Sequence, residues 1–96
     1  MVNLIIKKGL TIVTLFIEGT NEYYHIAGGT ILKGKLIVIK YENDEFNNIY
    51  EIPFSELSIS SLDELIKAFQ NKPNEYYEKI TRERIRIEKV IVKEDE

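Results

Sequence analysis

The feature that most constrains the fold is a change in the period of the apolar residues along the chain. Over the first 55 residues, short apolar runs are separated by turn residues, and the side chains within each run follow the two-residue period of a β-strand. From residue 61 the period becomes that of an amphipathic helix, and after residue 82 the two-residue alternation returns. This order predicts an α+β domain in which one main helix precedes a final C-terminal strand.

Turn residues separate the strand segments in the first part of the sequence. The expected strands, in chain order, are residues 3–7, 10–18, 22–27, 30–41 and 49–54. Residues 30–41 fit either one long strand with a bulge at Gly34 or a hairpin folded at Lys33 and Gly34. Residues 42–48 are polar and are expected to form a loop. The predicted sheet is mostly antiparallel, has five to six strands, and is either a meander or a half-barrel.

The segment LTIVTLFIE, residues 10–18, is apolar on both of the faces that a strand presents. One face would carry Val13, Leu15 and Ile17, and the other would carry Leu10, Ile12 and Phe16. Such a strand is typical of the centre of a sheet that is covered on both sides. We therefore expect this segment to be a central, doubly covered strand.

One main helix is predicted between residues 61 and 72. Ser61 and Glu64 have the spacing of a capping box, and the residues that follow place an apolar stripe on one face. Pro73 interrupts the helix, and residues 74–80 are expected to form a second short helical turn. The final strand is expected at 83–92, followed by frayed residues at 93–96.

The composition limits both the number of domains and the chemistry. Ninety-six residues, 44% of them hydrophobic, predict a single domain over residues 1–96. The absence of cysteine excludes disulfides, thiolate catalysis and Cys-ligated zinc. No apolar run approaches the ~20 residues of a membrane span. His25, the only histidine, has no nucleophile or acid partner in the sequence, and we expect no catalytic, cofactor or metal site and no enzymatic activity.

All three arginines of the chain lie two residues apart, at Arg82, Arg84 and Arg86. On a strand they would share one face with Glu88, whereas Ile85, Ile87 and Ile91 would share the opposite, buried face. The simplest interpretation is a solvated sheet face with cross-strand ion pairs to glutamates.

Two further interpretations give the arginines a partner. Three guanidiniums about 6.7 Å apart on a strand come close to the spacing of successive phosphates, and Tyr76 and Tyr77 would then stack on bases. The net charge of −3 weighs against nucleic acid. Arg and Tyr are also frequent at protein interfaces. We therefore favour a non-enzymatic interaction module that self-associates, as a dimer, or binds a protein partner; the alternative is a nucleic-acid accessory protein.

The chain is small, lacks cysteine and is biased toward Ile, Lys, Glu and Tyr. In size and composition it resembles small uncharacterised proteins of Sulfolobus-type archaea and their viruses. The resemblance implies a cytoplasmic setting in a thermophile and a self-assembling product, and it assigns no role to any residue.

Overall fold

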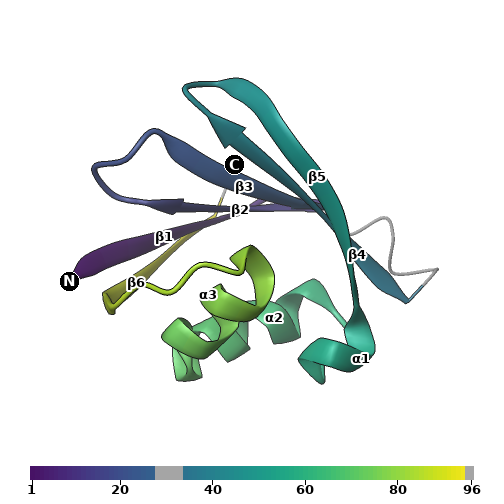
Figure 1. Cartoon of the computed structure of the whole chain (residues 1–96). Coiled ribbons are helices and arrows are strands. Elements are labelled where there is room, and N and C mark those ends of the chain that lie inside the picture. Colours follow the sequence, from purple (N-terminus) through teal and green to yellow (C-terminus); the bar gives the residue numbers. More distant parts are fainter. Residues whose placement is uncertain (28–33, 95–96) are drawn as a thin grey trace.

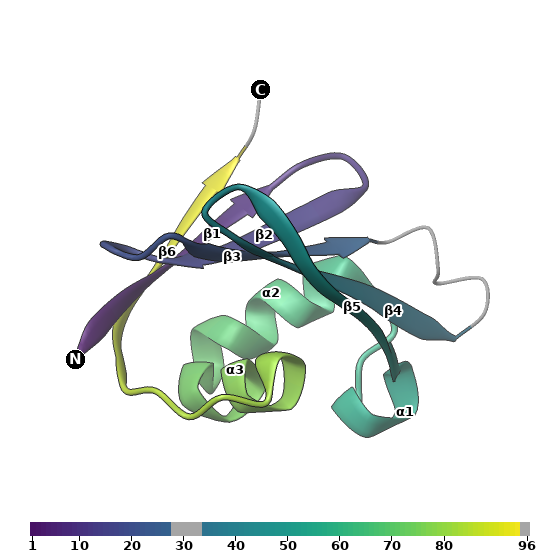
Figure 2. The ribbon, with the colours of Figure 1, turned by 45° about the horizontal axis from the view of Figure 1, so that its top comes forward.

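The computed structural model describes residues 1–27 and 34–94, and it places the helices on one side of a six-stranded sheet (Figures 1 and 2). The strands are β1 (Val2–Lys8), β2 (Ile12–Ile17), β3 (Glu22–Ala27), β4 (Lys35–Glu42), β5 (Glu45–Pro53) and β6 (Ile87–Glu94). The helices are α1 (Phe54–Leu57), α2 (Leu62–Asn71) and α3 (Pro73–Thr81). The predicted α+β class, with helix before the final strand, is confirmed.

The strand order is β5-β4-β3-β2-β1-β6, and the sheet is open. The first five strands form an antiparallel meander, because each follows its neighbour through a short connection. The helices then carry the chain from β5 at one edge to β6 at the other, as Figure 2 shows, so β6 joins β1 as a parallel neighbour. The sheet is therefore mostly antiparallel with one parallel pair.

The connection between β4 and β5 is shorter than predicted. Residues 42–48 were expected to be a loop, but only Asn43 and Asp44 form the turn, with φ of 53° and 62°. Asn and Asp tolerate this left-handed conformation, which two-residue hairpin turns require. β5 consequently begins at Glu45, and a register shift between Lys40 and Tyr41 accommodates an extra residue opposite. Of residues 30–41, residues 30–33 lie outside the described residues, and β4 begins at Lys35.

The final strand was predicted at residues 83–92. This prediction is wrong about where the strand starts and about the side of the sheet on which Ile91 lies. α3 ends when Arg82 adopts φ 66°, and residues 83–86 form an extended connector before β6. Val2 pairs with Ile87, but Asn3 pairs with Lys89, so β6 has one extra residue at this point. Beyond this register shift, each β6 side chain lies on the opposite side of the sheet from the side predicted. As a result, Val90 and Val92 pack toward the core, while Ile91 pairs with Ile5 on the other side. β6 includes residues 93 and 94, which were expected to fray; residues 95 and 96 lie outside the described residues.

The core lies between the sheet and the helices. Every strand contributes alternate side chains to it, and α2 contributes Leu65, Ile66 and Phe69. The strand residues buried on this side are Leu4, Ile6, Val13, Leu15, Ile17, Tyr24, Ile26, Leu36, Val38, Ile52 and Ile87. β2 lies between β1 and β3, so the prediction that it is a central strand is confirmed. The predicted cover of this strand is confirmed on the helical side of the sheet.

The predicted capping signal at Ser61 is confirmed with one difference. The Ser61 hydroxyl accepts a hydrogen bond from the Glu64 N–H at 3.2 Å, as the motif requires. The Glu64 carboxylate reaches one residue further back and accepts from the Ser60 N–H at 2.7 Å. Pro73 separates α2 from α3, as its position predicted.

Replacing Ser61 by alanine is expected to lower the free energy of unfolding by about 1 kcal/mol, because the Glu64 N–H loses its acceptor. Urea denaturation followed by circular dichroism measures this loss. Ser55→Ala, at an exposed position of α1, is the matched control and should change the stability by less than about 0.5 kcal/mol. Equal effects of the two substitutions would contradict the role of Ser61.

Candidate functional site

The three arginines are exposed but do not form the predicted stripe. Arg82 lies at the C-terminal end of α3, and its Cζ lies 5.6 Å from the centre of the Tyr50 ring. Arg84 pairs with α3, its Nε 2.9 Å from Glu78 Oε1. Arg86 lies at the end of the connector, where its carbonyl accepts from the Val2 N–H. Arg84 and Arg86 line one shallow hollow beside α3, whereas Arg82 lines another, so the three guanidiniums lie on no common strand face.

Tyr76 and Tyr77 do not join the arginines in a stacking surface. Tyr77 is only 3% exposed and packs in the core, with its ring edge-on to Tyr24. Tyr76 is half-buried, donates its hydroxyl to the Leu57 carbonyl at 3.0 Å, and packs on Phe69. Both rings hold α3 in place, and the Tyr77 ring cannot stack on a base without leaving the core.

The side of the sheet away from the helices carries a row of large apolar and aromatic side chains. Cross-strand register places them next to one another from one edge of the sheet to the other. This row is Ile91, Ile5, Phe16, Tyr23, Tyr41 and Phe46; a second row beside it is Lys93, Lys7, Thr14, His25, Ile39 and Ile49. We call the two rows, together with Ile12 and Ile37, the open face.

Aromatic rings form a cluster in the middle of the open face. Tyr23 and Tyr41 stack with centroids 5.0 Å apart and planes inclined by 11°. The His25 ring meets both of them edge-on at 5.2 Å, and Phe46 extends the cluster from Tyr41. Interlocked rings of this kind hold their shape without a cover, because each restricts the rotamers of the next.

His25 is held in a weakly polar setting within this cluster. Its Nδ1 lies 2.9 Å from the Thr14 hydroxyl, and both side chains are partly buried. Burial lowers the pKa of His25, since the charged imidazolium loses hydration there. The neutral ring is therefore favoured, which keeps the centre of the open face uncharged.

A shallow hollow of about 430 Å³ lies beside the cluster. Its walls include Lys7, Phe16, Tyr23 and His25, and the turn residues Asn43 and Asp44 close one end. The Tyr23 hydroxyl donates to Asp44 at 3.2 Å, and the Lys7 ammonium lies 5.2 Å from the centre of the Phe16 ring.

In the described part of the chain, the open face is most exposed at the β5 edge and at the start of β2, whereas Ile5, between Phe16 and Ile91 in the first row, is only 5% exposed. Phe46 is 61% exposed, Ile49 is 52% exposed and Ile12 is 44% exposed. The sequence analysis singled out none of these residues as a site. The sequence did contain a signal for this surface, however. Residues 10–18 have a second apolar face, and we expected other parts of the protein to pack on it. Residues 1–27 and 34–94 supply a cover on the helical side alone (Figure 1).

Charge is distributed unevenly across this side of the sheet. Lys7, Lys89 and Lys93 lie on β1 and β6, at one edge. Glu51 on β5 and Asp44 in the adjoining turn lie at the other edge, where Glu51 also pairs with Lys35 at 3.3 Å. The β6 edge is thus basic, the β5 edge carries Asp44 and a Glu51 carboxylate that is already paired with Lys35, and the apolar rows lie between the two edges.

No protein-family model, no curated protein and no solved structure matches this chain. Within residues 1–27 and 34–94, no three His, Cys, Asp or Glu side chains gather in a way that could hold a metal ion. None of the helices in that part of the chain has the length and apolar content to cross a membrane. The geometry of the open face therefore makes it the candidate site.

Proposed function

We propose that this protein is a non-enzymatic interaction module that forms a homodimer through its open face. The observation that carries the proposal is that central strand β2 is apolar on both sides but packs against helices on one side only. Contiguous exposed apolar surface of this kind marks interaction sites in folded proteins. A second copy of the chain would provide the missing layer.

The charge pattern favours a second copy as the occupant. Two sheets can pack face to face about a two-fold axis that runs parallel to the strands. This operation places β6 of one protomer over β5 of the other, and β1 over β4. The row that ends in Lys93 then faces the row that ends in Ile49, so that Lys93 lies one row away from Glu51 of the other protomer, twice per dimer. Opposite charges at the rim would fix the register, while the aromatic rows supply the buried area.

The nucleic-acid alternative gains no support from the arrangement of the arginines. Arg84 is already neutralised by Glu78, and Tyr77 is a core residue. We also propose the cytoplasmic setting and the thermophilic archaeal source that the resemblance to small proteins of Sulfolobus-type archaea implies.

Charged substitutions on the open face are expected to dissociate the dimer. Phe46→Glu and Ile49→Glu place a carboxylate where two protomers would meet, and each should weaken association at least about tenfold, because an unpaired buried charge is costly. Sedimentation velocity over a range of protein concentrations measures the dimer fraction. Leu10→Glu is the control, since Leu10 is fully exposed and lies outside the six strands.

The same experiment can reject the proposal. A wild-type protein that stays monomeric up to high micromolar concentration would overturn it. A dimer that Phe46→Glu and Ile49→Glu leave intact would overturn it as well. Binding of single-stranded DNA that weakens with salt and with Arg84→Ala, in a protein that does not dimerise, would support the nucleic-acid alternative in its place.

A further inference from the structure

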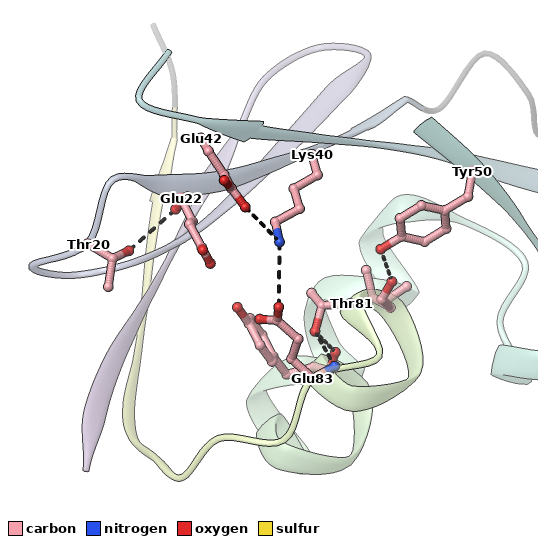
Figure 3. Close-up of polar contacts among 9 residues, drawn as sticks. Thr20, Glu22, Lys40, Glu42, Tyr50, Thr81 and Glu83 are labelled. Carbon is pink, nitrogen blue, oxygen red and sulfur yellow. Dashed lines mark hydrogen bonds and ion pairs between the residues drawn. The ribbon is translucent and has the colours of Figure 1, made fainter. Parts of the chain in front are cut away.

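A second hollow lies on the opposite side of the sheet, where the helical layer ends. It has a volume of about 340 Å³ and lies between β3, β4, β5 and the end of α3. Six side chains that line it carry its chemistry: Tyr24, Lys40, Asn47, Asn48, Tyr50 and Arg82. We call it the Lys40 pocket. Figure 3 shows its surroundings, with Lys40 and Tyr50 on the sheet and Thr81 and Glu83 at the end of α3.

Lys40 is the most enclosed cation of this region. Its side chain is 16% exposed, and its ammonium lies 3.1 Å from Glu42 and 3.5 Å from Glu83. Burial alone would lower the pKa of Lys40, but the hydrogen bond to Glu42 and the charges of Glu83, Glu22 and Glu42 together raise it. The lysine is therefore a charged donor at neutral pH, directed from β4 toward the connector (Figure 3).

Tyr24 provides a second, independent sign of a ligand. Its side chain is 2% exposed, and its hydroxyl is buried without a hydrogen-bond partner. A buried hydroxyl without a partner is costly, and a donor left in that state calls for an acceptor. Tyr24 lines the Lys40 pocket and lies next to Lys40 across the strand pair β3–β4.

Among the side chains that line the pocket, donors outnumber acceptors, and the carboxylates that pair with Lys40 lie at its border. Lys40 and the Arg82 guanidinium contribute N–H groups, and no carboxylate lies within 4 Å of Arg82 in the described part of the chain. The Asn48 side-chain oxygen is already used by the Ile49 N–H, which leaves its amide N–H groups. The Tyr50 hydroxyl donates to the Ile80 carbonyl. A ligand that complements this set must be rich in acceptors.

We propose that the Lys40 pocket binds a small oxyanion, the phosphate or carboxylate group of a ligand, between Lys40, Arg82 and the Tyr24 hydroxyl. Guanidinium and ammonium groups form strong charge-assisted hydrogen bonds with such oxygens. The site lies on the helical side of the sheet, away from the open face, and it does not depend on the proposed dimer.

Three carboxylates flank the pocket and determine how the anion would enter. Glu22 and Glu42 extend from the ends of β3 and β4, and Glu83 lies on the connector. Glu83 holds its carboxylate 3.5 Å from Lys40, and its side chain is 45% exposed, so it can swing outward. In the free protein Glu42 and Glu83 both compete for Lys40, and Glu83 forms the longer of the two contacts. The incoming oxyanion displaces it, and Glu83 sets the affinity.

The proposal is tested by titrating the uniformly ¹⁵N-labelled protein with inorganic phosphate, and in parallel with acetate, at constant ionic strength maintained with chloride. We expect saturable shifts at the backbone amides of Asn47, Asn48 and Arg82. Saturation by phosphate alone identifies a phosphate site, and saturation by acetate alone identifies a carboxylate site. The absence of saturable shifts at these amides with either anion overturns the proposal.

Variants of the pocket, compared with a charge-matched variant outside it, separate a specific site from a general effect of net charge. Lys40→Met and Arg82→Gln should each weaken binding about tenfold, whereas Glu83→Gln should strengthen it severalfold by removing the competitor. Arg82 is exposed, so its substitution keeps the test valid even if Lys40→Met fails to fold. Lys67→Met, an exposed position on α2 outside the pocket, is the charge-matched control. Equal weakening by Lys67→Met, or weakening by Glu83→Gln, overturns the proposal.

Discussion

Between about pH 9 and pH 12 the free energy of unfolding is expected to fall by about 5 kcal/mol, because two core tyrosines keep their protons in the folded chain. Tyr24 and Tyr77 are 2% and 3% exposed. Burial raises the pKa of both well above the ordinary value of 10.0, and nearby charges add to the shift, with Glu83 acting on both phenols. The loss is large relative to the typical stability of a small domain.

The sign of the effect follows from where the protons are bound. Above pH 10 the tyrosines of the unfolded chain release their protons, while the buried phenols keep theirs. The folded state then binds more protons than the unfolded state, so stability falls as the pH rises. Below pH 10 both states are protonated, and these residues contribute no pH dependence.

Urea denaturation at a series of pH values measures the slope, and substitutions assign it. Tyr24→Phe and Tyr77→Phe should each remove about half of the loss contributed by the pair. The pKa of Lys40 is also raised, so Lys40 adds a further loss of stability as the pH rises. The Tyr24→Phe and Tyr77→Phe variants both retain this loss. Phe69→Leu, which changes the core without a titrating group, should lower stability equally at every pH. A slope that neither tyrosine substitution changes would contradict this account.

The elements coded by local sequence could be predicted. Residues 22–27 form β3 with the predicted bounds, and the main helix begins at the predicted capping residue Ser61. In both places the residue pattern and the neighbouring turn or cap signals agree, so few long-range contacts are needed to decide the structure. The mostly antiparallel sheet follows from the same signals, because short connections favour antiparallel neighbours. These signals did not decide between a meander and a half-barrel.

The elements that were wrong depend on single backbone conformations. The start of β5 depends on positive φ at Asn43 and Asp44, which turns a polar stretch into a tight hairpin. The start of β6 depends on positive φ at Arg82, which ends α3 and leaves the arginines on a connector. The bulge opposite Val2 then reverses the facing of Ile91. Asn43 and Asp44 are residue types that tolerate positive φ, so this turn had a signal in the sequence. The positive φ of Arg82 and the bulge opposite Val2 had no residue pattern that distinguishes them from their alternatives.

Neither candidate site could be located from the sequence, because each combines residues from several elements. The row from Ile91 to Phe46 crosses all six strands, and its continuity depends on the parallel placement of β6 beside β1. The Lys40 pocket joins β3, β4 and β5 to the end of α3. Strand order and register are long-range properties, and a single sequence specifies them only through the complete fold.

Truncating the Phe69 ring is expected to lower the free energy of unfolding by about 3–5 kcal/mol, because Phe69→Ala removes a fully buried ring and leaves a cavity. Phe69 lies on α2 and packs on Tyr76 of α3, with ring centroids 6.3 Å apart. The cavity would lie between the helical layer and the sheet, where the surrounding side chains are already closely packed. Urea denaturation at neutral pH measures the loss.

Phe46→Ala is the matched control, because it deletes the same ring from the side of the sheet that no helix covers. Phe46 is 61% exposed, so the loss at a concentration where the chain is monomeric should stay below about 1 kcal/mol. At a concentration where the proposed dimer forms, the loss should increase, since the ring would then be buried by the second copy. A loss near that of Phe69→Ala in the dilute monomer would mean that the same chain covers both sides of its sheet, and the open face would not exist.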